Sequence, residues 1–327
     1  MEPKQIDSAR MDHRYLRLAD LHRMRNLVFS SRRVVEGQYA GRHASSQRGH
    51  SVEFNDYRPY APGDEIGNID WKVYGRSDKM FIKLFEHQSD MTVNLLVDAS
   101  ASMAYAGQLA PGPASASPSS ASASRRRSDS TDSKYDVACL MAAAIAFLTT
   151  RQQDKVAFGL AREGLQSFHR PLGAFSHLNN ILRAMEVTRP GGRAGLAEAV
   201  EAMARRTSRK GLLVLFSDLL EEEESLLEAM SIFTHRGNEV IMFHLLHAHE
   251  FQLPDWSEAL FIDSETKHRI RLNVDDIRPA YDERMKRFVD GWSSAFRARR
   301  IDYNFVTTAA PYQKALESYL ISRASRM

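Results

Sequence analysis

Carboxylate and hydroxyl oxygens alternate directly after one of the most apolar stretches of the chain. Asp98, Ser100 and Ser102 follow the apolar run Val93–Val97, with one residue between successive oxygen donors. Such a run is typical of a strand that is buried on both faces of a parallel sheet. Open α/β sheets bind ligands at the carboxyl ends of their strands, and hard oxygen donors are the ligands that Mg²⁺ prefers. The spacing therefore indicates a divalent-metal site on a strand-end loop.

A second apolar stretch ends in the same kinds of side chain. Residues 212–216 are followed by Ser217 and Asp218. Because parallel strands end at the same edge of a sheet, these oxygens are expected near the first set. The sequence thus predicts one metal site formed by Asp98, Ser100, Ser102 and Asp218.

These motifs carry a family resemblance. The Asp98-x-Ser100-x-Ser102 pattern resembles the metal-ion-dependent adhesion site (MIDAS) of von Willebrand factor A domains. The segment 48–103, with EFNDYRPYAPGDEIGNIDW at 53–71, and the later SDLLE at 217–221 resemble the bacterial DUF58 family. In the family's signature block the chain departs at Gly67, where an arginine is expected. The resemblance implies a Rossmann-like α/β fold of the von Willebrand A type, in which a mostly parallel sheet is flanked by helices. An N-terminal helix with an irregular or β extension would precede it.

The resemblance also implies a third loop that contributes a threonine to the metal. The matching residues here are 192–196, and Ala194 stands at the threonine position. Alanine cannot coordinate Mg²⁺ or Mn²⁺, so metal binding is expected to be weakened. Two interpretations stay open: weak divalent binding with a water in the vacant position, or hydroxyls that only cap the following helix.

Relatives of this type are linked to MoxR-type AAA+ ATPases, so the resemblance implies such a protein partner, in the assembly or maturation of a client. The sequence has neither a nucleotide-binding P-loop nor a hydrolase nucleophile elbow. We therefore expect a non-catalytic interaction module, with no catalytic residues, no organic cofactor and no small-molecule substrate.

Two alternatives remain. The basic segment 10–48 would suit nucleic acid or an anionic surface. A metal-dependent hydrolase is the other alternative, and the best enzyme-like cluster comprises His244, His247, His249 and Glu250. That cluster does not match the H-E-x-x-H pattern, and alternation along a strand would turn His244 and His247 to opposite faces, so a structural or solvent-exposed role is expected for it.

Composition indicates an ordinary globular protein. The chain has 327 residues, 43% hydrophobic residues and a formal net charge of +3, which by itself does not imply a nucleic-acid partner. Cys139 is the single cysteine, which excludes an internal disulfide. The longest apolar run, 140–148, is much shorter than the roughly 20 residues of a membrane span, and the N-terminus lacks a signal-peptide pattern. A cytoplasmic location is expected.

The hydrophobic pattern predicts two parts: residues 1–90, with a helix at 13–29 and the signature block, and residues 91–327. A Ser/Ala/Pro-rich insertion at 106–133 is predicted to be disordered, because it cannot form a core. The other predicted helices are at 134–151, 175–186, 196–206, 221–234, 276–296 and 311–325. Strands are predicted at 80–85, leading into the sheet, and at 154–160, 165–169, 211–216, 239–247 and 301–306, with two more within 255–275.

Overall fold

The structure, a computed structural model of the chain, describes residues 13–16, 29, 52–60, 69–77, 79–87, 91–107, 133–207 and 211–325. The chain divides into two compact units, one comprising Met1–Ser31 with Met91–Met327 and the other Arg32–Asp90. The division after residue 90 coincides with the sequence-based boundary. Of the N-terminal residues, the described ones, 13–16 and 29, fall in the larger unit.

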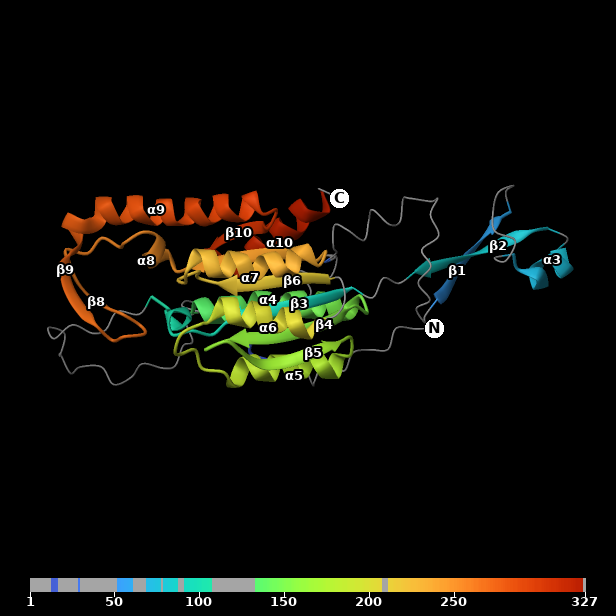
Figure 1. The fold of residues 1–327 in the computed structure, drawn as a ribbon, viewed down its shortest axis with the longest axis horizontal. Coiled ribbons are helices and arrows are strands. Elements are labelled where there is room, and N and C mark those ends of the chain that lie inside the picture. The colour runs from blue at the N-terminus through green and yellow to red at the C-terminus, as the bar shows by residue number, and fades with distance from the viewer. Residues whose placement is uncertain are drawn as a thin grey trace, which may run out of the picture. The chain divides into compact units, whose positions relative to one another are not determined.

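A six-stranded sheet forms the centre of the larger unit (Figure 1). Its strands are β3 (Thr92–Asp98), β4 (Lys155–Ala161), β5 (Leu165–Leu172), β6 (Gly211–Ser217), β7 (Glu239–Leu246) and β10 (Asp302–Thr307). Their spatial order is β10-β7-β6-β3-β4-β5, and every pair is parallel except β4 with β5. Counted from β3 this is the order 3-2-1-4-5-6 of doubly wound folds. The order reverses between β3 and β6, so ligands are expected at the carboxyl ends of these two strands.

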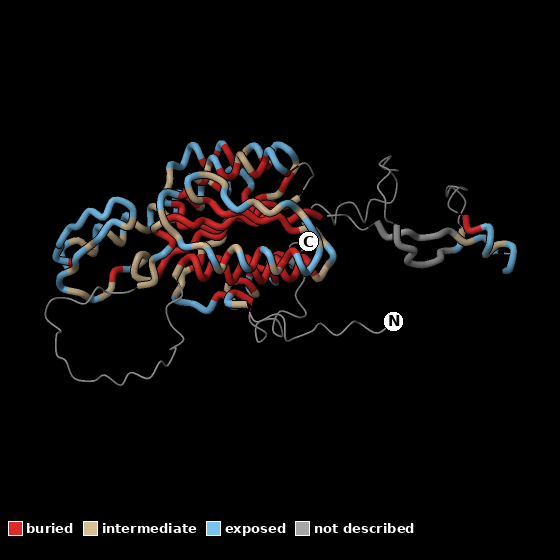
Figure 2. The backbone as a smooth tube through the Cα atoms, turned by 90° about the horizontal axis from the view of Figure 1, so that it is seen from below, coloured by how far each residue is buried: buried red, intermediate tan, exposed pale blue. Residues whose placement is uncertain are grey.

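Helices cover both faces of the sheet, and the strands lie buried between them (Figure 2). One face packs on α4 (Lys134–Arg151), α5 (Phe175–Val187) and α10 (Tyr312–Ala324). The opposite face packs on α6 (Leu196–Arg206), α7 (Glu223–His235) and α9 (Val274–Ala298). The predicted fold class, a mostly parallel α/β sheet flanked by helices, is confirmed.

Helix α4 lies deeper than an ordinary surface helix. Every residue from Lys134 to Thr150 is buried, as the apolar composition around the whole helix predicted. Ser133 begins the helix with a capping box, in which it exchanges hydrogen bonds with Asp136. This deep burial leaves Lys134 without access to water.

An excursion leaves the sheet after β7. It contains the short helix α8 (Ala248–Phe251) and an antiparallel hairpin of β8 (Glu258–Ile262) and β9 (Arg269–Asn273). The two short strands predicted within 255–275 are therefore confirmed. Among the helices of the described ranges, none combines the length and apolar character needed to cross a membrane.

The smaller unit contains β1 (Val52–Pro59), α3 (Trp71–Ser77) and β2 (Phe81–His87). The strand predicted at 80–85 is present as β2, but it pairs with β1 in a separate antiparallel sheet and does not join the six-stranded one. The valine, phenylalanine and tyrosine of the β1 segment favour a strand.

The N-terminal segment differs from its prediction where the structure describes it. Residues 13–16 form a tight antiparallel bridge between His13 and Leu16 and not a helix. Tertiary contacts explain this, because Tyr15 and Leu16 are buried in the core and the Tyr15 hydroxyl donates to Asp136 at 2.7 Å. Residues 17–28 of the predicted helix and residues 108–132 of the predicted insertion lie outside the described ranges.

Candidate functional site

The loop after β3 brings three of the predicted oxygen donors together. The Asp98 carboxylate accepts the backbone N–H of Ser100 at 2.8 Å, and the Ser100 and Ser102 hydroxyl oxygens lie 3.0 Å apart. All three residues are buried, with exposed fractions of 1%, 2% and 7%. The alternating spacing therefore places these side chains in one spot, as predicted.

The end of β6 is joined to this loop by a short hydrogen bond. Ser217 donates its hydroxyl to Asp98 Oδ2 at 2.6 Å and accepts the backbone N–H of Leu219 at 3.0 Å. Strand register explains the contact, because Val97 pairs with Phe216 in the parallel ladder and the next residues face each other. The predicted meeting of the two strand ends is present in the structure.

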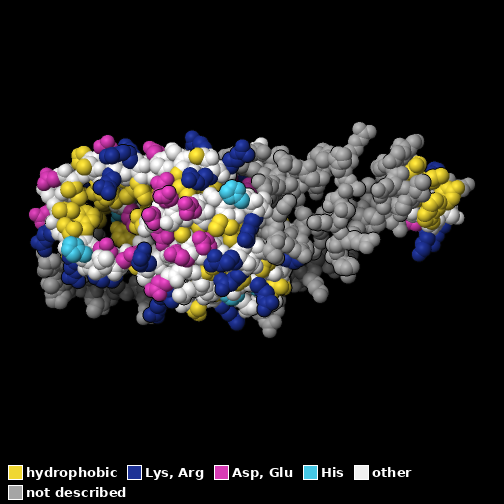
Figure 3. All heavy atoms as spheres, in the orientation of Figure 1, with side chains coloured by type: hydrophobic (Ala, Val, Ile, Leu, Met, Phe, Trp, Pro, Cys, Tyr) yellow, Lys and Arg dark blue, Asp and Glu magenta, His cyan; other side chains and the backbone are white. Residues whose placement is uncertain are grey.

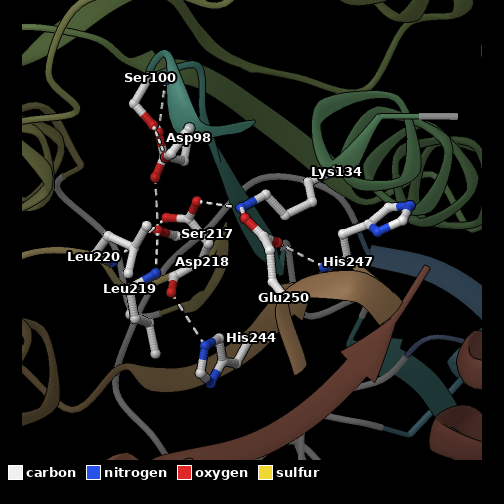
Figure 4. A network of polar contacts seen from close by, with 11 residues as sticks. Asp98, Ser100, Lys134, Ser217, Asp218, Leu219, Leu220, His244, His247 and Glu250 are labelled. Atoms are coloured by element: carbon white, nitrogen blue, oxygen red, sulfur yellow. Dashed lines mark hydrogen bonds and ion pairs between the residues drawn. The ribbon is translucent and has the colours of Figure 1, made fainter. Parts of the chain in front are cut away.

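Asp218, the fourth predicted ligand, points toward a buried ammonium group (Figure 4). Lys134 Nζ lies 2.8 Å from Asp218 Oδ2 and 2.6 Å from Glu250 Oε1, and the lysine side chain is fully buried. The other Asp218 oxygen accepts the backbone N–H of Leu220 at 3.4 Å. Asp218 thus borders the same cleft as Asp98, but it is already paired with a cation of the protein itself.

The third loop also lies at the site. Gly191 donates its N–H to the Ala99 carbonyl, and Ala101 donates to the Gly192 carbonyl, both at 2.9 Å. Ala194 is 5% exposed and lines the cleft, so its position agrees with the threonine position that the resemblance implies. Gly195 begins α6 with φ of 59°, and a Cβ there would lie 2.6 Å from the Gly164 nitrogen. The loop is therefore tightly fitted, but Ala194 offers no hydroxyl.

A cleft of about 570 Å³ opens over these loops. Seven carboxylates and one guanidinium line it: Asp98, Glu163, Glu198, Asp218, Glu221, Glu222, Glu265 and Arg193. Figure 3 shows acidic side chains gathered near one end of α6 and α7, the end at which β8 and β9 lie. Such a cleft attracts cations, because its fixed charges are overwhelmingly negative.

Burial raises the pKa of Asp98 to about 7, and the negative charge of Asp218 adds to the rise. Hydrogen bonds from Ser217 and Ser100 oppose it, because they stabilise the ionised carboxylate. A cation beside the Asp98 carboxylate would favour its ionised form and so offset the cost of burying that charge.

The four predicted donors differ in how well they fit a divalent metal ion. Asp98, Ser100 and Ser102 fit Mg²⁺ or Mn²⁺, because a carboxylate and two hydroxyls converge beside an acidic cleft. Asp218 does not fit as the site stands, because its carboxylate is held by Lys134. Within the described ranges, no three histidine, cysteine, aspartate or glutamate side chains converge as a metal-binding group.

The histidine cluster has structural contacts. His244 is fully buried, with Nδ1 2.7 Å from the Tyr303 hydroxyl and Nε2 3.1 Å from the Asp218 carbonyl. His247 begins α8, where its Nδ1 accepts the His249 backbone N–H at 3.1 Å. These contacts agree with the structural role predicted for the cluster, and His244 in addition supports the backbone of Asp218.

Sequence reasoning missed Lys134. It placed Ser217 at the second strand end without including it among the ligands, and it grouped Glu250 with the histidine cluster and not with Asp218. The sequence does carry one indication of this role of Lys134. A lysine at the start of a helix that is apolar on all sides is expected to be buried and therefore paired. Its partners lie 84 and 116 residues away in the sequence, so the sequence offers no local signal for them.

Comparison with known proteins defines the family. The profile described as "Protein of unknown function DUF58" matches residues 56–111 and 116–288, which is more than half of the chain. The chain belongs to the DUF58 family. An uncharacterized protein of Mycobacterium tuberculosis is 25% identical to this DUF58 protein over 247 residues, which cover 74% of this chain and 70% of that protein.

The solved structures described next are similar to this DUF58 protein only at low sequence identity and low TM-score. The conserved hypothetical protein BatB of Bacteroides thetaiotaomicron is 14% identical with a TM-score of 0.41, covering 72% of this chain and 100% of its own. A von Willebrand factor type A protein of Catenulispora acidiphila is also 14% identical, with a TM-score of 0.31, covering 51% of this chain and 35% of its own. At these values the likenesses carry no functional argument.

Proposed function

We propose that this DUF58 protein is a non-catalytic protein-interaction module that works in the cytoplasm and binds its partner through the cleft over β3 and β6. The observation that carries the proposal is the convergence of strand-end oxygens on one open acidic cleft. Interaction sites need a preformed surface, and backbone hydrogen bonds among three loops hold this one in place.

The partner that the family resemblance implies is a MoxR-type AAA+ ATPase, acting with this protein in the assembly or maturation of a client. A Mg²⁺ or Mn²⁺ ion, held by Asp98, Ser100 and Ser102, would supply positive charge in the acidic cleft. The chain's own residues define the rest of the surface. Leu220 adds an exposed apolar side chain to the rim, and Arg193 adds a positive one.

A pull-down from the native cell lysate tests the proposal. Wild-type protein and Asp98→Ala are compared as bait, each with Mg²⁺ and with a chelator. Glu201→Ala is the matched control, because Glu201 is a carboxylate of α6 that pairs with Arg205 and does not line the cleft. We expect an AAA+ ATPase to be captured by the wild type and the control and lost with Asp98→Ala.

The two variables separate the interaction from its metal dependence. Capture that needs Asp98 but persists in chelator would keep the cleft as the interface and remove the metal from the proposal. Capture that is equal for all three baits would contradict the proposed interface. Recovery of nucleic acid in place of a protein would contradict the proposed class of partner.

A further inference from the structure

A fully buried ammonium group lies beside the candidate metal site. Lys134 Nζ contacts Asp218 Oδ2 at 2.8 Å and Glu250 Oε1 at 2.6 Å, and none of the lysine side chain is exposed. Figure 4 shows the ammonium between the two carboxylates. One positive and two negative charges therefore form a buried cluster at the end of β6.

The start of α4 fixes the position of this ammonium. The Lys134 backbone N–H donates to the Tyr105 carbonyl at 3.1 Å, and the preceding Ser133 is locked in the capping box with Asp136. Asp136 is held in turn by Arg14 at 2.8 Å and by the Tyr15 hydroxyl at 2.7 Å. These bonds fix the start of the helix, and the contacts with Asp218 and Glu250 fix the ammonium at the end of the side chain.

Two carboxylates compensate the buried charge of the lysine. Lys134 Nζ lies within hydrogen-bond distance of both Asp218 Oδ2 and Glu250 Oε1, and a buried charge is tolerated when it is paired in this way. The cluster therefore places a positive charge where a divalent ion would use Asp218.

A divalent ion and the ammonium compete for the Asp218 carboxylate. An ion coordinated by Oδ2 would have to displace the ammonium, and an ion on Oδ1 would be repelled by it at short range. Asp98, Ser100 and Ser102 have no such competitor among the contacts of the described residues. The Lys134 side chain alone therefore explains why Asp218 is paired with a cation of the protein while the other three donors are not.

We propose that Lys134 is a tethered cation that competes with divalent metal ions for Asp218, so that the helix α4 sets how weakly this cleft binds metal. The inference rests on the proposed function only in that it concerns the same cleft. In the absence of metal the ammonium keeps Asp218 neutralised and the two loops in place. Metal affinity is therefore limited by an internal charge as well as by Ala194.

Titration of purified protein with Mn²⁺ tests this inference without any partner. We expect Lys134→Met to bind Mn²⁺ at least about tenfold more tightly than the wild type, because the competing charge is gone. Mn²⁺ should also raise the melting temperature of the variant more than that of the wild type. Lys314→Met is the matched control, because Lys314 is an exposed lysine in the first turn of α10 and its loss changes the net charge equally.

Lys134→Met leaves the Asp218 and Glu250 carboxylates without their cation, which is expected to lower stability. A second variant avoids this effect. Lys134→Met combined with Glu250→Gln leaves the net charge of the cluster unchanged and still frees Asp218, so it should show the same gain. Adding Asp218→Asn to either variant should abolish the gain. Folding of either variant only in the presence of Mn²⁺ would also support the inference.

Affinity equal to that of the wild type in both variants would overturn the inference, as would variants that remain unfolded with and without Mn²⁺. A gain that survives Asp218→Asn would overturn it too, because the metal would then not depend on Asp218. These outcomes are independent of the pull-down. A cleft without a partner can still show the gain, and a cleft that binds its partner can fail to show it.

Discussion

Single side chains connect the loops of the candidate site, and Ser217 is the clearest case. Its hydroxyl donates to the buried Asp98 carboxylate and accepts the Leu219 N–H, so one small residue satisfies two polar groups of different loops. Leaving buried polar groups unpaired costs more than the mean worth of a hydrogen bond.

We therefore expect Ser217→Ala to lower the free energy of unfolding by about 1 to 3 kcal/mol. Urea unfolding followed by circular dichroism measures the change. Ser225→Ala is the control, because the exposed Ser225 hydroxyl donates to the exposed Glu222 carboxylate at 2.8 Å and its loss should change stability little. Equal losses in the two variants would contradict the role assigned to Ser217.

The four predicted donors were accessible to sequence reasoning because residue type, spacing and strand ends are local properties. Asp98, Ser100 and Ser102 needed only an apolar strand before them. The engagement of Asp218 by Lys134 depends on the packing of α4 against the sheet, which joins residues 84 positions apart. No local sequence pattern indicates a contact between residues that lie so far apart in the chain.

At the scale of elements, periodicity and caps predicted the helices well. The ranges of α4 and α6 are confirmed at both ends, because Ser133 and the glycines before Leu196 mark their starts. The partner of β2 was not predictable in the same way. An apolar strand pattern shows that a strand exists but not which of two sheets it joins.

The short helix α8 offers a test of how an element responds to acid. Burial, then the neighbouring His249 and Lys134, lower the pKa of its first-turn cap His247 from 6.5 to about 4. The unfolded histidine therefore binds a proton at a higher pH than the folded one. The stability that depends on neutral His247 is present above pH 6.5 and is lost as the pH falls towards 4.

We expect His247→Asn to lose less unfolding free energy than the wild type between pH 6.5 and pH 4. Asparagine keeps a side chain that can cap the helix but does not titrate. Urea unfolding at a series of pH values measures the difference. His235→Asn, at the end of α7, is the comparison, and if it reproduced the effect then His247 would not be the responsible group.

At the scale of the whole molecule, the N-terminal segment belongs with the six-stranded sheet. Leu16 is 2% exposed and packs in the same core cluster as β3 and α4, although 74 residues lie between it and Met91 in the chain. Sequence patterns placed the boundary at residue 90 but could not show that the chain's start returns to the larger unit, since that contact is tertiary.

Leu16→Ala should therefore destabilise the larger unit, by about 2 to 5 kcal/mol, as expected for a large-to-small change in a core. Leu220→Ala is the matched control, because Leu220 is 57% exposed and the same change leaves no cavity there. Thermal unfolding followed by near-ultraviolet circular dichroism measures both. A change as small as that of the control would show that the segment does not contribute to the core.

The Tyr105 carbonyl and the Lys134 N–H, which form a hydrogen bond, lie on opposite sides of the chain segment between Gly107 and Ser133. Cutting the chain between Gly107 and Ser133 would leave β3 on one fragment and both of its neighbours, β4 and β6, on the other. Asp98 would belong to the first fragment, and Lys134 and Asp218 to the second. The two pieces would form a complementation pair in which the central strand is the docking peptide, and the cleft would exist only in the reassembled protein.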